Sequence, residues 1–265
     1  MCVSTTEANF LGTKIYVGLQ DHPNHGLIWV LTYSNQAVSY SGPNAMLLHM
    51  WPPEEMTPEN FINTIRCPEI LNNMVTAFQP VTRGGTSRSA AVSKSPDFQF
   101  FKLGIYDVVL AKNALVIREA LKLVAARKRP VISDLLINYY AQELDGATIA
   151  LCCFDNTDVK QGQPLMMWYK ADIDYGFAPE LAKDVDVDHW LFASMPDMHY
   201  GQSVTYTDPN IPAEIRTFLP NRVVGLQVSG KMRNGDFHAP LKTIQSGVLR
   251  LLDIQRVHPN PASGK

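Results

Sequence analysis

The second residue of the chain is a cysteine, which stands directly behind the initiator methionine. If Met1 is removed, Cys2 carries a thiol and a free α-amine on the same residue. An α-amine has a pKa of about 8, so it can accept the proton of its own thiol without a separate histidine base. Cys2 is therefore a candidate nucleophile. The alternative is a position that tolerates cysteine without using it.

The residues after Cys2 resemble the start of the N-terminal-nucleophile (Ntn) hydrolases, in particular the cholylglycine hydrolase and penicillin V acylase group. Small polar residues follow the cysteine, and residues 12–18 read Gly-Thr-Lys-Ile-Tyr-Val-Gly ahead of Asp21. The sequence departs from the group at Leu19, where the group has an arginine, and at Asp21, which comes one residue early.

This resemblance implies a cysteine hydrolase that cleaves an amide bond in a small molecule or a peptide. Cys2 would be the nucleophile, and Asp21 would orient it. Asn44 is the candidate for the oxyanion-hole asparagine of the group, and Arg222 is the candidate for its later arginine.

Further histidines and acids could bind a metal ion or transfer protons. Pro23 and Gly26 predict a turn around the first two histidines, which are then simply exposed. Asp197 and His199 follow an apolar strand, in a loop that either faces a cleft or forms a packed turn. We expect no metal ion and no cofactor. A metal-assisted hydrolase is the alternative, with ligands from His22, His25, His189 and His199.

Residues 80–97 are rich in serine, threonine and glycine, which predicts a mobile surface loop. Gly84 and Gly85 stand between Arg83 and Arg88 and could bind an anion, but their spacing does not match a phosphate-binding P-loop. A solvated linker is the simpler interpretation. The sequence also lacks the short motifs of α/β-hydrolases, Rossmann enzymes, zincins and zinc ribbons.

The hydrophobic pattern predicts an α+β fold. Strand-like runs occur toward both ends of the chain, beginning with residues 13–18, 27–33 and 45–50, and they predict mostly antiparallel sheets. Residues 113–127 and 133–144 have the spacing of helices and are expected to form a central helical hairpin that covers a sheet.

Length and charge limit the choice of function. The chain has 265 residues, 46% of them hydrophobic, which is enough to bury a sizeable core. We expect one domain over residues 1–258 and a frayed tail over residues 259–265. The net charge of -2 argues against a nucleic-acid partner. The basic run at residues 127–129 is explained by the end of the preceding helix.

The remaining cysteines are Cys67, Cys152 and Cys153, which are too few for a disulfide scaffold in a chain of this length. We expect them to be reduced, in a cytoplasmic compartment. The sequence has no continuous apolar run long enough for a membrane span and no secretory signal, so we expect no membrane contact.

Two hypotheses follow. In the first, the chain is an Ntn amidohydrolase that uses Cys2 after removal of Met1. In the second, it is a non-catalytic interaction or assembly protein, such as a viral or host accessory factor, which forms a homo-oligomer. The second hypothesis expects that a Cys2→Ala variant keeps every property of the wild type.

Overall fold

The computed structural model describes most of the chain in separate segments. These are residues 2–5, 9–38, 42–77, 92–94, 97–158, 163–171, 187–193, 204–205, 208–227, 236–238, 240, 243, 250–253 and 255–257. Most of the predicted loop 80–97, the loop with Asp197 and His199, and the tail 259–265 lie outside the described residues.

One sheet has six strands in the order β1-β4-β9-β8-β7-β6, and every neighbouring pair in it is antiparallel. Its strands are β1 Cys2–Ser4, β4 Pro43–Met50, β6 Val92–Lys94, β7 Phe98–Leu103, β8 Tyr106–Ala111 and β9 Thr148–Asp155. The short strand β6 lies inside the segment that the sequence predicts as a loop.

The other large sheet has seven strands in the order β12-β13-β11-β2-β3-β10-β5. Its strands are β2 Asn9–His22, β3 Gly26–Val38, β5 Phe61–Ile62, β10 Leu165–Lys170, β11 Val187–Ala193, β12 Val204–Thr205 and β13 Arg222–Gln227. Only the pair β11 and β2 is parallel among the strands described for this sheet. A separate two-stranded pair joins β14 Asp236–His238 to β15 Gln255–Val257.

The helices are short. The α-helices are α1 Ile70–Ala77, α2 Ile117–Ala120, α3 Asp134–Glu143 and α4 Ala213–Arg216. The 3-10 helices are η1 Pro58–Asn60, η2 Ala114–Val116, η3 Leu121–Leu123, η4 Ala126–Lys128 and η6 Leu251–Asp253. Within the described part of the chain, no helix has the length and apolar character needed to cross a membrane.

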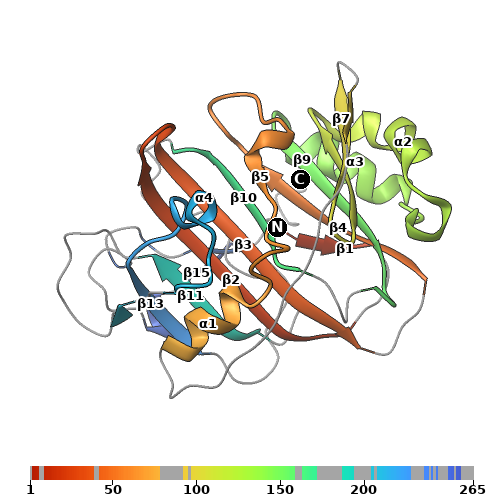
Figure 1. Cartoon of the computed structure of the whole chain (residues 1–265). Helices are drawn as coiled ribbons and strands as arrows, with labels where there is room; N and C mark the ends of the chain where they lie inside the picture. The colour runs from red at the N-terminus through yellow and green to blue at the C-terminus, as the bar shows by residue number, and fades with distance from the viewer. Residues whose placement is uncertain are drawn as a thin grey trace.

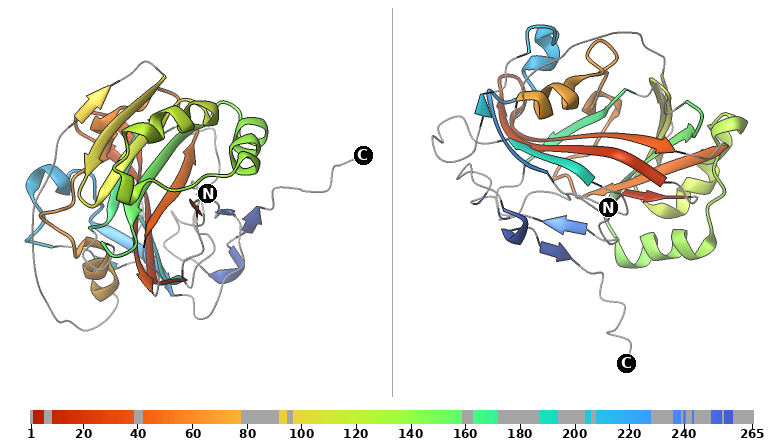
Figure 2. Two further views of the ribbon diagram at one scale, coloured as in Figure 1. Left: turned by 90° about the vertical axis from the view of Figure 1, so that its right-hand side faces the viewer. Right: turned by 90° about the horizontal axis from the view of Figure 1, so that it is seen from below.

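The two sheets pack face to face, with a layer of helices outside each of them (Figure 1, Figure 2). Successive side chains of a strand point to opposite faces, so each strand contributes to two apolar clusters. In β4, Met46 and Leu48 point toward the other sheet, where they meet Val17 and Leu31. The α+β class and the mostly antiparallel sheets are confirmed.

The outer faces carry the helical layers. Beyond the six-stranded sheet, the central segment packs on Leu47 and Leu151 through inward side chains such as Ile117 and Tyr140. Beyond the seven-stranded sheet, α1 and α4 pack on strands β2, β3 and β10. Their cluster includes Tyr16, Ile28, Ile70, Met74, Met166, Ile215 and Leu219.

The central segment covers its sheet as predicted, but the prediction of one continuous helix over residues 113–127 is wrong. The chain passes through η2, α2 and η3 and then turns at Val124, which has an extended ψ of 133°. The Ala125 N–H would bond to the carbonyl of Leu121 in a continuous α-helix. It donates instead to Oδ2 of Asp107 on β8, at 3.1 Å.

Asp107 also holds Lys128 from the basic run at residues 127–129. The Lys128 ammonium lies 3.2 Å from Oδ1 of Asp107 and donates to the Ile105 carbonyl at 2.6 Å. The side chains of Lys128 and Asp107 are 10% and 2% exposed, so this ion pair is buried. Arg127 pairs with Asp158 at 2.9 Å. The run is therefore engaged within the chain, at the end of the 3-10 helix η4 and not at the end of one continuous helix over residues 113–127.

We predict that Lys128→Met strongly destabilises the fold. The substitution leaves the Asp107 carboxylate buried with the Ala125 N–H as its partner. Removing one member of a buried ion pair costs about 3–5 kcal/mol, so the free energy of unfolding should fall by that amount in a denaturant titration. Lys122→Met is the control, because it removes an exposed partner of Glu119 and should hardly change the midpoint. Equal effects of the two variants would contradict the prediction.

The turn between β7 and β8 contains a glycine that lies against the side chain of Gln163. Gly104 has a φ of 55°, and a Cβ atom at this position would overlap the side-chain amide of Gln163. Gly146 has a φ of 74° with no atom near the corresponding Cβ position. Gly146→Ala should cost about 1–2 kcal/mol from the left-handed backbone alone. Gly104→Ala should cost at least as much in the same thermal or denaturant assay, because the new methyl group must also displace the end of the flexible Gln163 side chain. A smaller loss than in Gly146→Ala would contradict the prediction.

Candidate functional site

The structure places Cys2 in β1, at the edge of the six-stranded sheet, opposite Leu48 of β4. The Thr5 N–H continues this pairing and donates to the Ala45 carbonyl at 3.1 Å. The first residues of the chain are therefore paired into the sheet at the backbone.

Asn44 is fully buried in β4, and its side-chain amide forms hydrogen bonds to residues next to β1 and β9. Its Oδ1 accepts a hydrogen bond from Oγ1 of Thr5 at 3.1 Å, and its Nδ2 donates to Oδ1 of Asn156 at 3.3 Å. Asn44 lies four residues before Leu48, which pairs with Cys2. That separation is about 13 Å along a strand. The amide therefore does not lie beside Cys2.

Asp21 and Arg222 belong to the other sheet. Asp21 is exposed near the end of β2, opposite Leu27 and next to the turn into β3. Arg222 is half-buried at the start of β13, opposite Thr205. The turn between β2 and β3 and the strand β1 lie well apart in both views (Figure 1, Figure 2). The structure does not gather the four predicted catalytic residues around one point.

The other three cysteines are free thiols buried in the apolar clusters. Burial, together with the nearby carboxylate of Asp208, raises the pKa of Cys67 to about 11. Burial and the neighbouring carboxylate of Asp107 also raise the pKa of Cys153. Thiols of this kind carry little thiolate at neutral pH and behave as small apolar side chains.

The two histidines of the β2–β3 turn form part of an aromatic stack. The His22 ring stacks on His25 with a centroid distance of 4.5 Å and on Phe218 at 4.3 Å. His25 in turn stacks on Trp168 at 4.1 Å. His22 is buried, and its Nε2 lies 3.0 Å from Oγ1 of Thr217.

This stack does not look like a metal site. Nδ1 of His22 accepts the Asn24 N–H at 3.2 Å, so both ring nitrogens of His22 already have hydrogen-bond partners. Among the residues that the structure describes, no group of three or more histidines, cysteines or acids is placed to hold a metal ion. The predicted ligand His199 lies outside the described residues, and His189 is described only in the backbone of β11.

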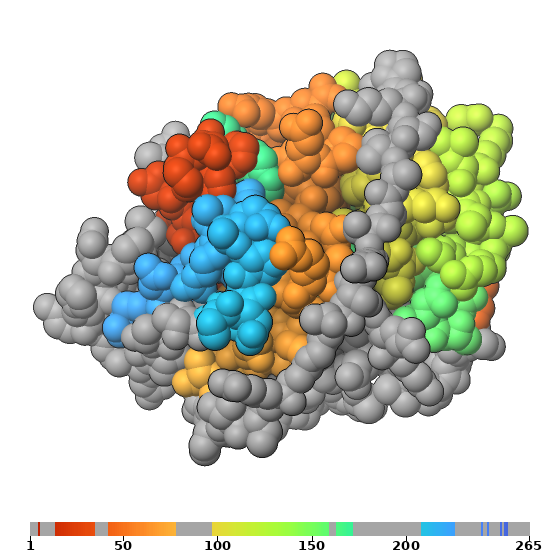
Figure 3. All heavy atoms as spheres, in the orientation of Figure 1, coloured from red at the N-terminus to blue at the C-terminus, as the bar shows by residue number. Residues whose placement is uncertain are grey.

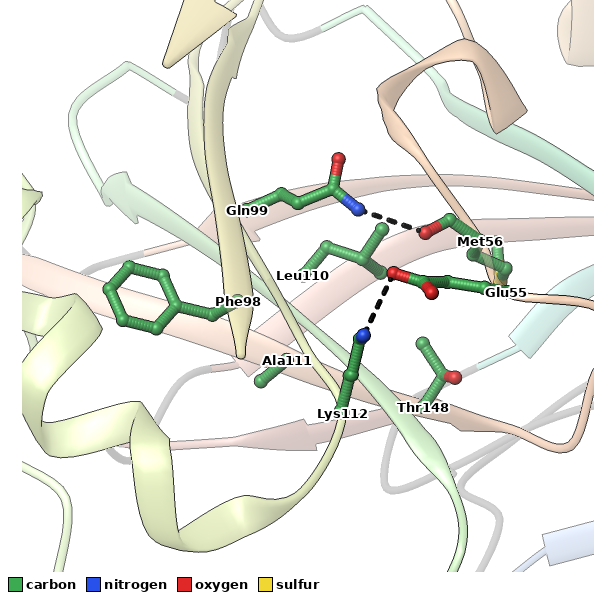
Figure 4. Close-up of a pocket in the computed structure, with 8 residues that line it drawn as sticks. All are labelled: Glu55, Met56, Phe98, Gln99, Leu110, Ala111, Lys112 and Thr148. Atoms are coloured by element: carbon green, nitrogen blue, oxygen red, sulfur yellow. Dashed lines mark hydrogen bonds and ion pairs between the residues drawn. The ribbon is translucent and has the colours of Figure 1, made fainter. Parts of the chain in front are cut away.

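A small pocket opens beside β7 and β8 (Figure 4). The Glu55–Lys112 ion pair of 3.1 Å lies across it, and Nε2 of Gln99 donates to the Met56 carbonyl at 3.1 Å. The pocket leaves about 10 Å³ of space, which is room for a single water molecule. The buried Oε1 of Gln99 is a polar group that such a water molecule could satisfy.

The outer surface of the central helical segment is unusually apolar. Six large apolar side chains are exposed in the described part of the chain, and four of them lie between residues 115 and 135. We call these four side chains the helical-layer patch: Leu115 (65% exposed), Leu123 (50%), Val131 (84%) and Leu135 (81%). The segment that carries them forms the right-hand side of the molecule in Figure 3.

Two polar contacts fix the relative positions of the elements in this layer. Arg118, one turn after Leu115, forms an ion pair with Asp134, the neighbour of Leu135. Arg129, close to Val131 in sequence, donates to the carbonyls of residues 122 and 124 on either side of Leu123. The helix η2 also packs against α3. The four apolar side chains are therefore presented by one connected layer.

Sequence reasoning missed this surface because it treated residues 113–127 as one helix and did not ask which of their apolar side chains stay exposed. The spacing of the apolar residues did indicate which of them are buried and which are exposed. Ile117, Ala120, Leu121 and Val124 follow the i, i+3, i+4, i+7 pattern of one helix face, and all four are buried. Leu115 and Leu123 fall outside that pattern and are exposed.

Comparison with known proteins gives weak matches to solved structures. No protein-family model matches the chain, and no curated protein gives a significant match. The crystal structure of baculovirus P35 matches with a TM-score of 0.40 and 12% identity, over 92% of each chain. The structure of a mutated baculovirus P35 after caspase cleavage matches with a TM-score of 0.41 and 11% identity, over 88% of this chain and 92% of that one.

The prediction of an Ntn amidohydrolase is wrong. Cys2 and Asn44 lie at separate points of one sheet, while Asp21 and Arg222 belong to the other, so the residues that the mechanism requires are not brought together. The prediction of an amide substrate, whether a small molecule or a peptide, depended on the hydrolase and is wrong for the same reason.

We predict that the buried thiols do not react in the folded protein. Cys67, Cys152 and Cys153 should be alkylated by iodoacetamide only after unfolding, because each is buried and free. Peptide mass analysis after labelling with and without denaturant measures this directly. Native labelling of Cys153 at the rate of an unfolded cysteine would contradict the burial described here.

Proposed function

We propose that this chain is a non-catalytic assembly protein that pairs with a second copy of itself through the helical-layer patch. The observation that carries the proposal is the exposure of Leu115, Leu123, Val131 and Leu135 on one connected layer. Single exposed apolar residues are common on soluble proteins, whereas contiguous apolar surfaces commonly mark interaction sites.

The charges around the patch favour a second copy as the occupant. Arg118 pairs with Asp134, Lys122 pairs with Glu119, and Arg127 pairs with Asp158. In a two-fold symmetric dimer the same surface faces itself, so an excess of one charge would repel its own copy. Arg129 donates to backbone carbonyls and not to an acid. The three other cations are paired with opposite neighbours, which limits that repulsion and leaves the apolar side chains available.

The proposal requires no reaction at Cys2. A Cys2→Ala variant should pair as well as the wild type, since β1 joins the six-stranded sheet through its backbone. This separates assembly from the hydrolase hypothesis, in which the thiol is essential.

We predict that Leu135→Glu disrupts self-association of the full chain. Pairing would bury the new carboxylate at both symmetry-related positions, and such a cost weakens the dimer by more than about ten-fold, which corresponds to about 1.4 kcal/mol. Sedimentation velocity over a dilution series measures the change. Leu252→Glu is the matched control, because Leu252 is 89% exposed but belongs to η6 and not to the patch.

The same experiment can overturn the proposal in two ways. A wild-type chain that remains monomeric at every concentration would refute self-pairing. A monomeric chain that binds an added caspase, the enzyme class that cleaved the matched P35, and loses that binding in Leu135→Glu would assign the patch to an outside protein. Equal self-association of Leu135→Glu and Leu252→Glu would show that pairing uses another surface.

A further inference from the structure

The turn between β2 and β3 is joined to residues 208–220, which include α4, by a contact centred on His22. Its ring stacks on both His25 and Phe218, and both of its nitrogens form hydrogen bonds. His22 and Thr217 are 195 residues apart in sequence, so this is a long-range contact. Figure 1 shows α4 beside the β2–β3 hairpin.

The hydrogen bonds assign the protonation state of the ring. Nδ1 of His22 faces the Asn24 N–H, which can only donate, so Nδ1 must carry a lone pair. Oγ1 of Thr217 donates to the Glu214 carbonyl, so its lone pairs are available to accept the Nε2–H of His22. The contact therefore fits the neutral Nε2–H tautomer. A proton on Nδ1 would place two N–H groups against each other.

No group around His22 compensates for a positive charge. The titratable or charged residues on the packed elements include Asp21, His25, Glu59, Lys170, Asp208, Glu214 and Arg216. Glu214 is engaged by Arg66 at 2.9 Å, and Arg216 donates to Asn221. In the part of the chain that the structure describes, His22 forms no ion pair. Burial lowers the pKa of His22, and the neighbouring His25 lowers it further.

The segment held by this contact covers apolar surface. Ile211, Ile215 and Leu219 are buried in the cluster beneath α1 and α4, together with Ile70 and Leu71 of α1. Phe218 is itself partly buried against this cluster. Loss of the His22 contact would loosen the 208–220 segment at the end nearest to the hairpin.

We propose that His22 is an acid-sensitive clasp that holds residues 208–220 on the seven-stranded sheet near neutral pH and releases them when its ring is protonated. The clasp lies on the opposite helical layer from the patch, so it stands independently of the assembly proposal. The proposal rests on the hydrogen bonds to both ring nitrogens of His22. It also rests on the stacking of that ring in a place where, among the described residues, no ion pair would stabilise a positive charge.

The direction of the pH effect follows from linkage. The folded state depresses the pKa of His22 below its ordinary value of 6.5, so the open state binds more protons. The stabilisation that the His22 contact gives to residues 208–220 is therefore complete above the open-state pKa. It declines as the pH falls from there through the folded-state pKa. At about pH 5.5 the open population can rise at most about ten-fold relative to neutral pH.

Hydrogen exchange of the full chain tests the clasp. After correction for intrinsic rates, amides of residues 208–220 should exchange faster, by up to about ten-fold, at about pH 5.5 than at about pH 7.5. Strand β8 in the other sheet should show no such local change. His22→Gln keeps a side-chain donor but cannot titrate, so it should remove the pH dependence. His25→Gln is the matched control, because it leaves both hydrogen bonds of His22 in place.

Each outcome decides the proposal. Unchanged exchange of residues 208–220 in the wild type would overturn it, as would a pH effect that survives in His22→Gln but disappears in His25→Gln. If His22→Gln does not fold, NMR titration of the wild type decides. The signals of the His22 ring and of Thr217 must then change with one midpoint, and separate midpoints would refute the clasp.

Discussion

The buried ion pair between Asp107 and Lys128 determines how the chain covers its six-stranded sheet. A carboxylate near the start of β8 is costly to bury unless it is paired and hydrogen-bonded. Lys128 and the Ala125 N–H satisfy it, and this requirement turns the chain at Val124. The central segment therefore consists of short helices bent over the sheet. The apolar side chains that do not fit under this bent layer are the ones found on its surface.

The sequence predicted the sheets well because their signal is local. Residues 13–18 and 27–33 are rich in β-branched and aromatic side chains, and they form the middle of β2 and the first half of β3. Burial on both faces of β4 agrees with the apolar run at residues 45–50. The continuous helix predicted at residues 113–127 was wrong because the helix is interrupted by contacts with Asp107. No local sequence pattern connects Asp107 to Lys128.

The site could not be predicted for a related reason. The likeness of residues 2–21 to an enzyme family rests on residue types along one stretch, whereas catalysis depends on which strands become neighbours. Asp21 follows Cys2 closely in sequence, yet β1 and β2 enter different sheets. Two sheets between helical layers are also compatible with many functions, so the agreement in architecture carried no information about chemistry. The exposed positions 115 and 123, by contrast, could have been read from the helical period.

The parallel pairing of β11 with β2 has a consequence for the synthesis of the chain. β2 is made first and can pair with β3 at once, but its other edge is completed only by residues 187–193. At ribosomal rates this leaves the edge of β2 without its partner for a time on the order of ten seconds. An open strand edge can pair with other chains during that interval. The nascent chain is thus most vulnerable to aggregation before β11 emerges, and chaperone binding over this interval would protect its central strand.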